Sequence, residues 1–201
     1  MELIIGITGG VACGKSTAAS MLADRLSVPH VDTDRMAKRL MAEDPAIRVA
    51  IESEISPRAY GLDGKLDRDW LRNATFSDPR VRDRLNGIVH PIVRQRWTAQ
   101  VSACRISKGS CLVEIPLLYE VNAAAIFDEV VVVGASPEVQ VDRLTKLRGL
   151  SDTIARKILA SQMNLSDKVK RASRVLWNDS DLATLKRQAD YLSAILLKTS
   201  A

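Results

Sequence analysis

Short apolar runs alternate with segments of helical spacing along this chain. Residues 3–8 form an apolar, β-branched run that ends at Gly9 and Gly10, and residues 16–26 then repeat apolar side chains every three or four positions. Three later runs are too uniformly apolar to have one solvated face, at residues 28–32, 111–115 and 130–133. The pattern predicts an α/β fold in which helices cover both faces of a parallel sheet and ligands bind at the carboxyl ends of the strands.

The spacing of these runs is uneven. About 80 residues separate the second run from the third, many more than one crossover helix needs. Helix-start residues and apolar periodicity predict helices in this interval, and a glycine-containing turn at residues 60–65 interrupts them. We therefore expect a small helical insertion at about residues 44–108. Its expected helices are Pro45 to Ile55, Asp67 to Phe76, Pro79 to Asn86 and Pro91 to Lys108.

The composition is that of an ordinary globular protein. The chain has 201 residues, of which 46% are hydrophobic and 26% charged, so it is long enough to bury a core as one domain. This balance excludes disordered, collagen-like and disulfide-scaffold proteins. Only 4% of the residues are aromatic, which argues against binding of single-stranded nucleic acid, because such proteins stack bases on aromatic side chains.

The net charge of +5 is concentrated in two segments. Residues 61–110 hold 10 basic and 5 acidic side chains, and residues 136–175 hold 9 and 4. Both segments flank the expected ligand edge of the sheet, so their surplus of positive charge favours anionic ligands. The alternative is that these charges only solvate helix faces.

The cysteines and the first residues bear on location. Cys13, Cys104 and Cys111 are odd in number and lack metal-ligand spacing, which favours a reducing compartment. Residues 1–10 lack the basic-then-apolar pattern of a secretory signal, and no apolar run is long enough to span a bilayer. We expect a cytoplasmic protein without membrane or nucleic-acid partners, as a monomer or a weak homo-oligomer.

The segment GGVACGKST, residues 9–17, satisfies the phosphate-binding pattern G-x-x-x-x-G-K-[ST] between a predicted strand and a predicted helix. Glycines let backbone N–H groups converge on phosphate oxygens at a helix N-terminus, and Lys15 adds a mobile positive charge. The Ser16 hydroxyl is an oxygen ligand of the kind that Mg²⁺ takes. Cys13 is expected to fill space rather than to act as a nucleophile. The alternative is a glycine-rich turn with an exposed lysine.

Carboxylates follow two of the predicted strands. Asp34, in VDTDRMAK, is the candidate base that takes the proton of an acceptor hydroxyl during phosphoryl transfer. The alternative is that Asp34 only caps a helix at residues 35–41. Asp32 is expected to orient Mg²⁺ or Asp34. Glu114 ends the third strand, where P-loop proteins often place an acid beside metal-bound water, and a turn residue at a strand end is the alternative.

Basic residues are expected on a small helical lid at about residues 136–172. Helices are predicted at 136–147 and 150–163, and closure of such a pair brings an arginine over the transferring phosphate while it excludes water. Arg143 is the first candidate for this catalytic role and Arg148 the second. Surface charges without a role are the alternative.

Together these features predict a three-layer α/β/α P-loop NTPase with a helical insertion and a lid. Its core is expected at about residues 1–43, 109–135 and 173–201. Asn178, which follows the short apolar run 175–177, is a candidate for a hydrogen bond to an adenine edge or for a turn.

These motifs resemble those of the dephospho-CoA kinase family along almost the whole chain. The matching strings are ITGGVACGKST, VDTDRMAK, GKLDRDWLRNATFSDPRVRDRLNGIVHPIV, VEIPLLYE, VQVDRLTKLRGLS and ASQMNLSDKVKRASRVLWN. A phosphate loop alone indicates only nucleotide binding. The strings LDR and F-x-D-P and the pair His90–Pro91, at this spacing, are specific to that family.

The resemblance implies a kinase that uses ATP and Mg²⁺ to phosphorylate the 3'-hydroxyl of the dephospho-CoA ribose, which gives CoA and ADP in the last step of coenzyme A biosynthesis. It places the acceptor near Asp34 and His90 and the CoA moiety on the helical insertion, whose arginines suit a pyrophosphate. The alternative for His90 is a packing residue at a helix start. The residues expected to contact ATP are Gly10, Val11, Ala12, Cys13, Gly14, Lys15, Ser16, Thr17, Arg148 and Asn178, with Lys15, Asp34 and Arg143 catalytic and Ser16 and Asp32 at the metal.

Several positions depart from the family pattern. Glu114 stands where Asp is usual, residues 147–148 stand where a basic and an acidic residue are common, and Ser180 stands where Gly often occurs. Ala12 occupies a loop position where Gly is frequent, which is tolerable if its φ is negative. Two other classes stay open from the residues alone. One is a different small P-loop kinase that acts on nucleosides, nucleotides or metabolites, and the other is a nucleotide-binding module without turnover.

Overall fold

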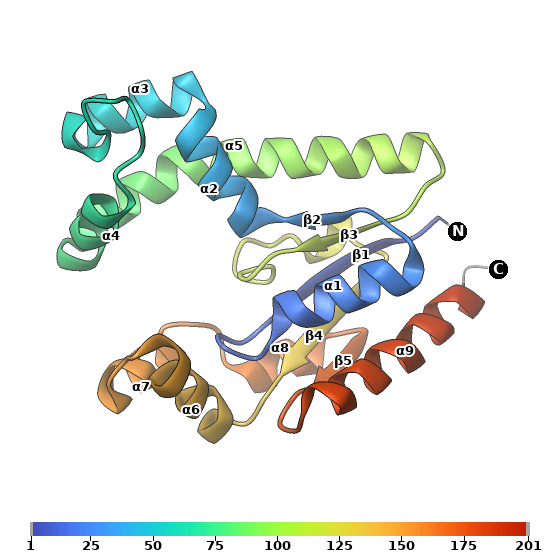
Figure 1. Ribbon diagram of the computed structural model, residues 1–201. Coiled ribbons are helices and arrows are strands. Elements are labelled where there is room, and N and C mark those ends of the chain that lie inside the picture. The colour runs from blue at the N-terminus through green and yellow to red at the C-terminus, as the bar shows by residue number, and fades with distance from the viewer. Residues whose placement is uncertain (1, 200–201) are drawn as a thin grey trace. The chain divides into compact units, whose positions relative to one another are not determined.

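The computed structural model describes residues 2–199 as a five-stranded sheet with helices on both sides (Figure 1). The strands are β1 (Ile4–Gly9), β2 (His30–Asp32), β3 (Cys111–Glu114), β4 (Glu129–Gly134) and β5 (Arg174–Trp177). Their order is β2-β3-β1-β4-β5, and every neighbouring pair is parallel. The predicted fold class and its four strands are confirmed, and the apolar run 175–177 belongs to a fifth strand.

One helix prediction is wrong. The segments 79–86 and 91–108 form a single helix, α5 (Pro79–Ile106), with Pro91 inside it. Proline removes one backbone hydrogen bond from a helix. The helix nevertheless continues, because apolar side chains four residues apart form a buried stripe along one of its faces. These buried residues are Val89, Val93, Trp97 and Val101.

The remaining helices agree with the sequence where it predicted them. They are α1 (Lys15–Leu26), α2 (Thr33–Glu43), α3 (Pro45–Glu54), α4 (Arg68–Ser77), α6 (Pro137–Arg148), α7 (Asp152–Ala160), α8 (Leu165–Arg171) and α9 (Leu182–Thr199), with short 3₁₀ turns η1 (Pro57–Ala59) and η2 (Ala124–Ile126). Within residues 2–199, no helix combines the length and the apolar character that a membrane span requires.

Both faces of the sheet are covered, and every residue of β1 is therefore buried. Helices α1 and α9 pack side by side against one face (Figure 1), where Ile5 and Ile7 share a core with Leu22 of α1. On the other face, the Phe127 ring lies so close to Gly6 that an added Cβ would come within 2.7 Å of it. A glycine in the middle of this strand is thus required by packing.

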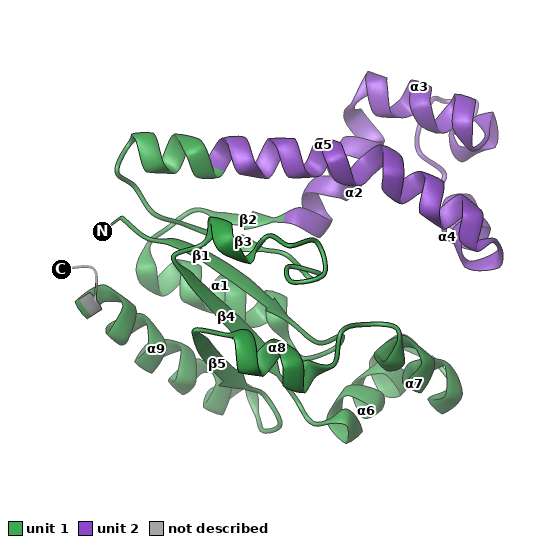
Figure 2. Cartoon of the chain, turned by 180° about the vertical axis from the view of Figure 1, so that it is seen from behind, with its two compact units in different colours: residues 1–32, 101–201 green, residues 33–100 purple. Residues whose placement is uncertain are grey.

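The chain divides into two compact units (Figure 2). The first comprises residues 1–32 and 101–201 and contains the sheet. The second, residues 33–100, is helical apart from an isolated bridge between Tyr60 and Leu66, and the Tyr60 hydroxyl donates a 2.7 Å hydrogen bond to the carbonyl of Met41. The sequence placed its helical insertion at about 44–108.

Helices α6 and α7 form a pair within the first unit, as the sequence predicted. Val141, Leu144 and Ala155 make a small apolar core between them, and Val11 and Ala12 of the phosphate loop pack against it. Gly149, with a φ of 65°, ends α6 in the left-handed conformation that glycine favours. The helix pair thus contacts the loop directly.

Candidate active site

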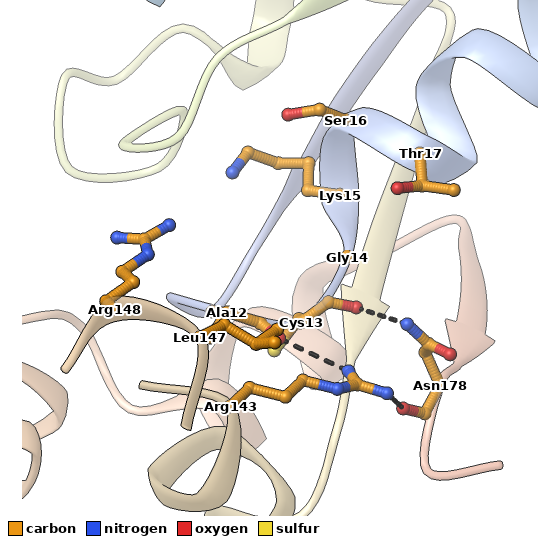
Figure 3. A pocket seen from close by; sticks show the side chains of 11 residues that line it. Ala12, Cys13, Gly14, Lys15, Ser16, Thr17, Arg143, Leu147, Arg148 and Asn178 are labelled. Carbon is orange, nitrogen blue, oxygen red and sulfur yellow. Dashed lines mark hydrogen bonds between the residues drawn. The ribbon is translucent and has the colours of Figure 1, made fainter. Parts of the chain in front are cut away.

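A cavity of about 370 Å³ opens where β1 meets the N-terminus of α1 (Figure 3). It brings together three segments that are far apart in sequence, namely the glycine-rich loop, α6 and the residue after β5. Val11 does not line it, because its side chain packs against the core of α6 and α7. The lining residues are Gly10, Ala12, Cys13, Gly14, Lys15, Ser16, Thr17, Arg143, Leu147, Arg148 and Asn178.

The backbone of the loop is left-handed at two positions. Gly14, the N-cap of α1, has a φ of 82°, and a Cβ there would lie 2.4 Å from Asn178 Nδ2. Ala12 has a φ of 57°, so the negative φ under which an alanine would be tolerated here without strain is not observed. This conformation costs a residue with a Cβ about 1–2 kcal/mol. The loop is therefore held in shape by its surroundings.

Those surroundings are polar contacts from α6 and from the end of β5. Asn178 is buried and its Nδ2 donates to the carbonyl of Cys13 at 2.9 Å. Arg143 donates from Nη1 to the carbonyl of Ala12 at 3.2 Å and from Nη2 to the carbonyl of Asn178 at 2.8 Å. Both side chains thus brace the phosphate loop.

Arg148 and Cys13 also line the cavity but do not brace the loop with their side chains in this way. Arg148 is exposed, and in Figure 3 it points away from Asn178, toward which Arg143 reaches. The Cys13 thiol is fully buried, and this burial raises its pKa. A buried thiol with a raised pKa is a poor nucleophile, which agrees with a space-filling role for Cys13.

Glu114 lies beside the first residues of α1. The Ser16 hydroxyl donates to Glu114 Oε1 at 2.6 Å, and Lys15 Nζ lies 3.9 Å from the same oxygen. The other oxygen, Oε2, is 3.2 Å from His30 Nε2. Burial raises the pKa of the Glu114 carboxyl, but the bonds from His30 and Ser16 and the charge of Lys15 outweigh this and hold the pKa below its ordinary value. The carboxylate is ionised at neutral pH.

The donor set at this edge fits a magnesium ion. Mg²⁺ binds oxygen ligands, commonly one or two carboxylates of the protein together with substrate phosphates, and keeps several waters. The Ser16 hydroxyl and the Glu114 carboxylate already lie within hydrogen-bond distance of each other, and Asp32 occupies the position in β2 that pairs with Glu114 in β3. Ser16, Glu114 and Asp32 are thus the residues suited to hold such an ion.

Two predicted site residues belong to the second unit, whereas every residue that lines the cavity belongs to the first. Asp34 is exposed in the first turn of α2, which begins at Thr33, so Asp34 lies inside this helix and not before it. His90 is exposed inside α5, and the interpretation as a packing residue at a helix start is wrong.

His30 is a polar residue of the site that the sequence did not predict. It begins β2, and the register pairs it with Leu112, two residues before Glu114 in β3. Residues two apart in a strand share a face, so His30, Asp32 and Glu114 lie on the same face of the sheet. The spacing of His30 and Asp32 in the sequence was the available signal.

Comparison with known proteins gives consistent results. The sequence model of a family described as dephospho-CoA kinase matches residues 3–184. A dephospho-CoA kinase of Thermosynechococcus vestitus is 37% identical over 194 residues, which cover 96% of this chain and 95% of that protein. A dephospho-CoA kinase of Bacillus anthracis is 36% identical over 200 residues, which cover 98% of each.

Solved structures agree in fold. The structure of TT1252 from Thermus thermophilus superposes with a TM-score of 0.71 at 33% identity, covering 98% of this chain and 97% of that one. A shikimate kinase from Acinetobacter baumannii, at 15% identity, superposes with a TM-score of 0.54 and covers 98% of this chain and 94% of its own. The second likeness concerns the fold alone.

Proposed function

The chain belongs to the dephospho-CoA kinase family, and from this premise we propose how its residues carry out that reaction. The protein phosphorylates dephospho-CoA at the 3'-hydroxyl of its ribose with ATP as donor, in coenzyme A biosynthesis. The observation that carries our proposal is the cavity at the glycine-rich loop, which Lys15 and Ser16 line, together with the Glu114 carboxylate that both of these residues contact.

The ATP phosphates bind in this cavity. The N-terminus of α1 offers backbone N–H groups without a partner inside the helix, and the helix dipole favours negative charge there. The Lys15 ammonium neutralises charge on the terminal phosphates. Because Arg143 and Asn178 hold the carbonyls of Ala12 and Cys13, the loop is preorganised for the phosphates.

Ser16, Glu114 and Asp32 would hold a magnesium ion beside these phosphates. The ion, when bound, supplies positive charge that stabilises the transferring phosphoryl group. The Glu114 carboxylate accepts a hydrogen bond from the Ser16 hydroxyl, which leaves the oxygen lone pairs of Ser16 available as a metal ligand.

Asp34 acts as the general base. The 3'-oxygen of the acceptor attacks the terminal phosphorus of ATP, the bond from phosphorus to the leaving ADP oxygen breaks, and the hydroxyl proton moves to the Asp34 carboxylate. Asp34 is exposed in the first turn of α2, where the helix N-terminus favours an ionised carboxylate.

The two lid arginines take different parts in this proposal. Arg148 is exposed at the end of α6 and lines the cavity, so its guanidinium is available to a phosphate oxygen. Arg143 already donates to two carbonyls, which supports a bracing role. Its remaining N–H donors are those available for the catalytic role that the sequence predicts for it. Helices α6 and α7 form the lid, at about residues 136–172.

The second unit carries the acceptor site in this proposal. It holds Asp34 and His90 and 13 basic against 10 acidic side chains, a surplus that suits the pyrophosphate of dephospho-CoA. The free cysteines Cys13, Cys104 and Cys111 favour a reducing compartment, so we keep the cytoplasm as the proposed location, with the protein a monomer or a weak homo-oligomer.

The role of Asp34 is tested by Asp34→Asn, with Asp69→Asn as a matched control. Asp69 is likewise exposed in the first turn of a helix, α4. Loss of a general base lowers kcat by about 10²- to 10⁴-fold, and we expect this for Asp34→Asn, with an unchanged Kd for ATP, while the control keeps its kcat. An Asp34→Asn variant with the kcat of the unaltered protein would remove Asp34 from the mechanism.

A further inference from the structure

The two oxygens of the Glu114 carboxylate have different partners. Oε1 accepts a hydrogen bond from the Ser16 hydroxyl at 2.6 Å and lies 3.9 Å from Lys15 Nζ. Oε2 is 3.2 Å from His30 Nε2. The side chain of Glu114 is 4% exposed and that of His30 22% exposed, so water has little access to either oxygen. His30 thus contacts Oε2 and has no other part in the proposed mechanism.

The length of the Glu114 side chain explains why a second contact matters. A glutamate reaches its carboxylate through three rotatable bonds, and its last torsion is broad rather than confined to narrow wells. One hydrogen bond from Ser16 fixes one oxygen but leaves rotation of the group about that contact. A second bond at Oε2 removes this freedom, because both oxygens then have a defined partner.

We infer that His30 is a positioning residue for catalysis, whose Nε2 holds Glu114 Oε2 so that Oε1 stays directed at Ser16 and Lys15. The inference rests on the proposed role of Glu114 in phosphoryl transfer. His30 does not touch either substrate in this account. It acts through Glu114, in the way that residues behind a metal or phosphate site orient the groups in front of them. The ring must carry a proton on Nε2 to donate this bond.

The competing explanation is that His30 only packs at the start of β2. Replacement by Leu keeps a side chain of similar size at this half-buried position but removes the Nε2–H donor. Replacement by Gln keeps a donor amide that can reach Oε2. A purely structural role predicts that both variants behave according to their effect on stability, whereas a positioning role predicts that Gln rescues what Leu loses.

The kinetic test compares His30→Leu, His30→Gln and Arg25→Leu. Arg25 lies in the last turn of α1 and pairs with the partly exposed Asp190, so Arg25→Leu controls for the loss of a polar side chain that has no contact with Glu114. We expect kcat to fall about tenfold or more in His30→Leu, with KM for dephospho-CoA unchanged, and to recover in His30→Gln. The control keeps its kcat. A His30→Leu variant with unaltered kcat, or a His30→Gln variant no better than Leu, would overturn the inference.

A spectroscopic readout separates this inference from the proposed function. The chain has 2 histidines, so the imidazole ¹⁵N resonances of the purified full chain are assigned by their loss in His30→Gln. We expect a protonated Nε2 for His30, and a shift of that resonance in Glu114→Gln. No shift would contradict the pairing even if the enzyme is fully active. A clear shift in a protein that transfers no phosphate would instead contradict the proposed function and leave the pairing intact.

The same variants give a coupling measurement. If His30 acts through Glu114, the kcat losses of His30→Leu and Glu114→Gln are not additive, and the double variant is little slower than Glu114→Gln alone. Additive losses would show that His30 contributes to turnover by a route that does not include Glu114, and would overturn the positioning role.

Discussion

The Ser16 hydroxyl donates a 2.6 Å hydrogen bond to Glu114, a residue 98 positions later in the sequence. The contact exists because β1 and β3 are neighbours in the sheet, with Ile7 paired to Glu114, and because α1 begins shortly after β1 ends. The order of the strands thus brings an anion-binding loop and a buried carboxylate to one edge. This edge is where a parallel α/β sheet generally binds its ligands.

The ionised state of Glu114 predicts a pH dependence of stability. Its pKa in the folded protein lies below the ordinary value of 4.5, so the ionised carboxylate stabilises the fold above that pH, and this contribution is lost as the pH falls through the lowered pKa. Urea unfolding at several pH values should show a steeper loss of unfolding free energy below pH 4.5 in the unaltered protein than in Glu114→Gln. Parallel pH profiles for the two proteins would contradict this.

Ala12→Gly should stabilise the protein. Glycine adopts a positive φ without the penalty of about 1–2 kcal/mol that Ala12 bears at φ 57°, and this gain exceeds its greater entropy loss of about 0.5–1 kcal/mol. We expect the free energy of unfolding to rise by about 0.5–1 kcal/mol in a urea titration. Ala103→Gly, at an exposed position of α5, should instead lower it by about 1 kcal/mol. A loss of stability in both variants would argue against strain at Ala12.

Lys168 should be a strong stability determinant. It is fully buried, its Nζ lies 2.8 Å from Glu120 Oε1, and it donates to the carbonyl of Pro116 at 3.2 Å. Removing one partner of a buried ion pair leaves the other charge uncompensated, so Lys168→Met should cost about 3–5 kcal/mol of unfolding free energy. The exposed neighbour Lys170, paired with Asp167, is the control, and Lys170→Met should cost under about 1 kcal/mol.

The buried charge itself is tested by a double variant. Lys168→Met combined with Glu120→Leu removes both charges, and should recover part of the stability that Lys168→Met alone loses. If the double variant is instead less stable than Lys168→Met alone, the stability lost in Lys168→Met comes from packing and not from the uncompensated Glu120 carboxylate.

The fold was predictable where local sequence decides the structure. Strands β1 and β3 are buried along their whole length and β4 is buried from Val130 on, so their apolar runs are visible without any knowledge of their partners. The fifth strand has a weaker apolar pattern, because it begins at Arg174 and because Val175 and Trp177 are partly exposed. Pro91 indicated a helix break, but burial of Val89 and Val93 on either side of it outweighs the lost hydrogen bond.

The site was predictable in part, for the same reason. The loop pattern is contained in nine consecutive residues, so its position and residues followed from the sequence. The positive φ of Ala12 did not, because the contact that holds its carbonyl comes from Arg143, 131 residues away. The pairing of His30 with Glu114 depends on the register of β2 and β3, which apolar periodicity alone does not determine.

The most direct test of this account is the formation of ADP by the purified full chain with Mg²⁺ and ATP, measured with and without dephospho-CoA. We predict that ADP forms in proportion to added dephospho-CoA and that the product carries its new phosphate on the 3'-oxygen of the ribose. A nucleoside monophosphate in place of dephospho-CoA should give no more ADP than the blank. Equal ADP release with and without dephospho-CoA, or a preference for the monophosphate, would contradict the account.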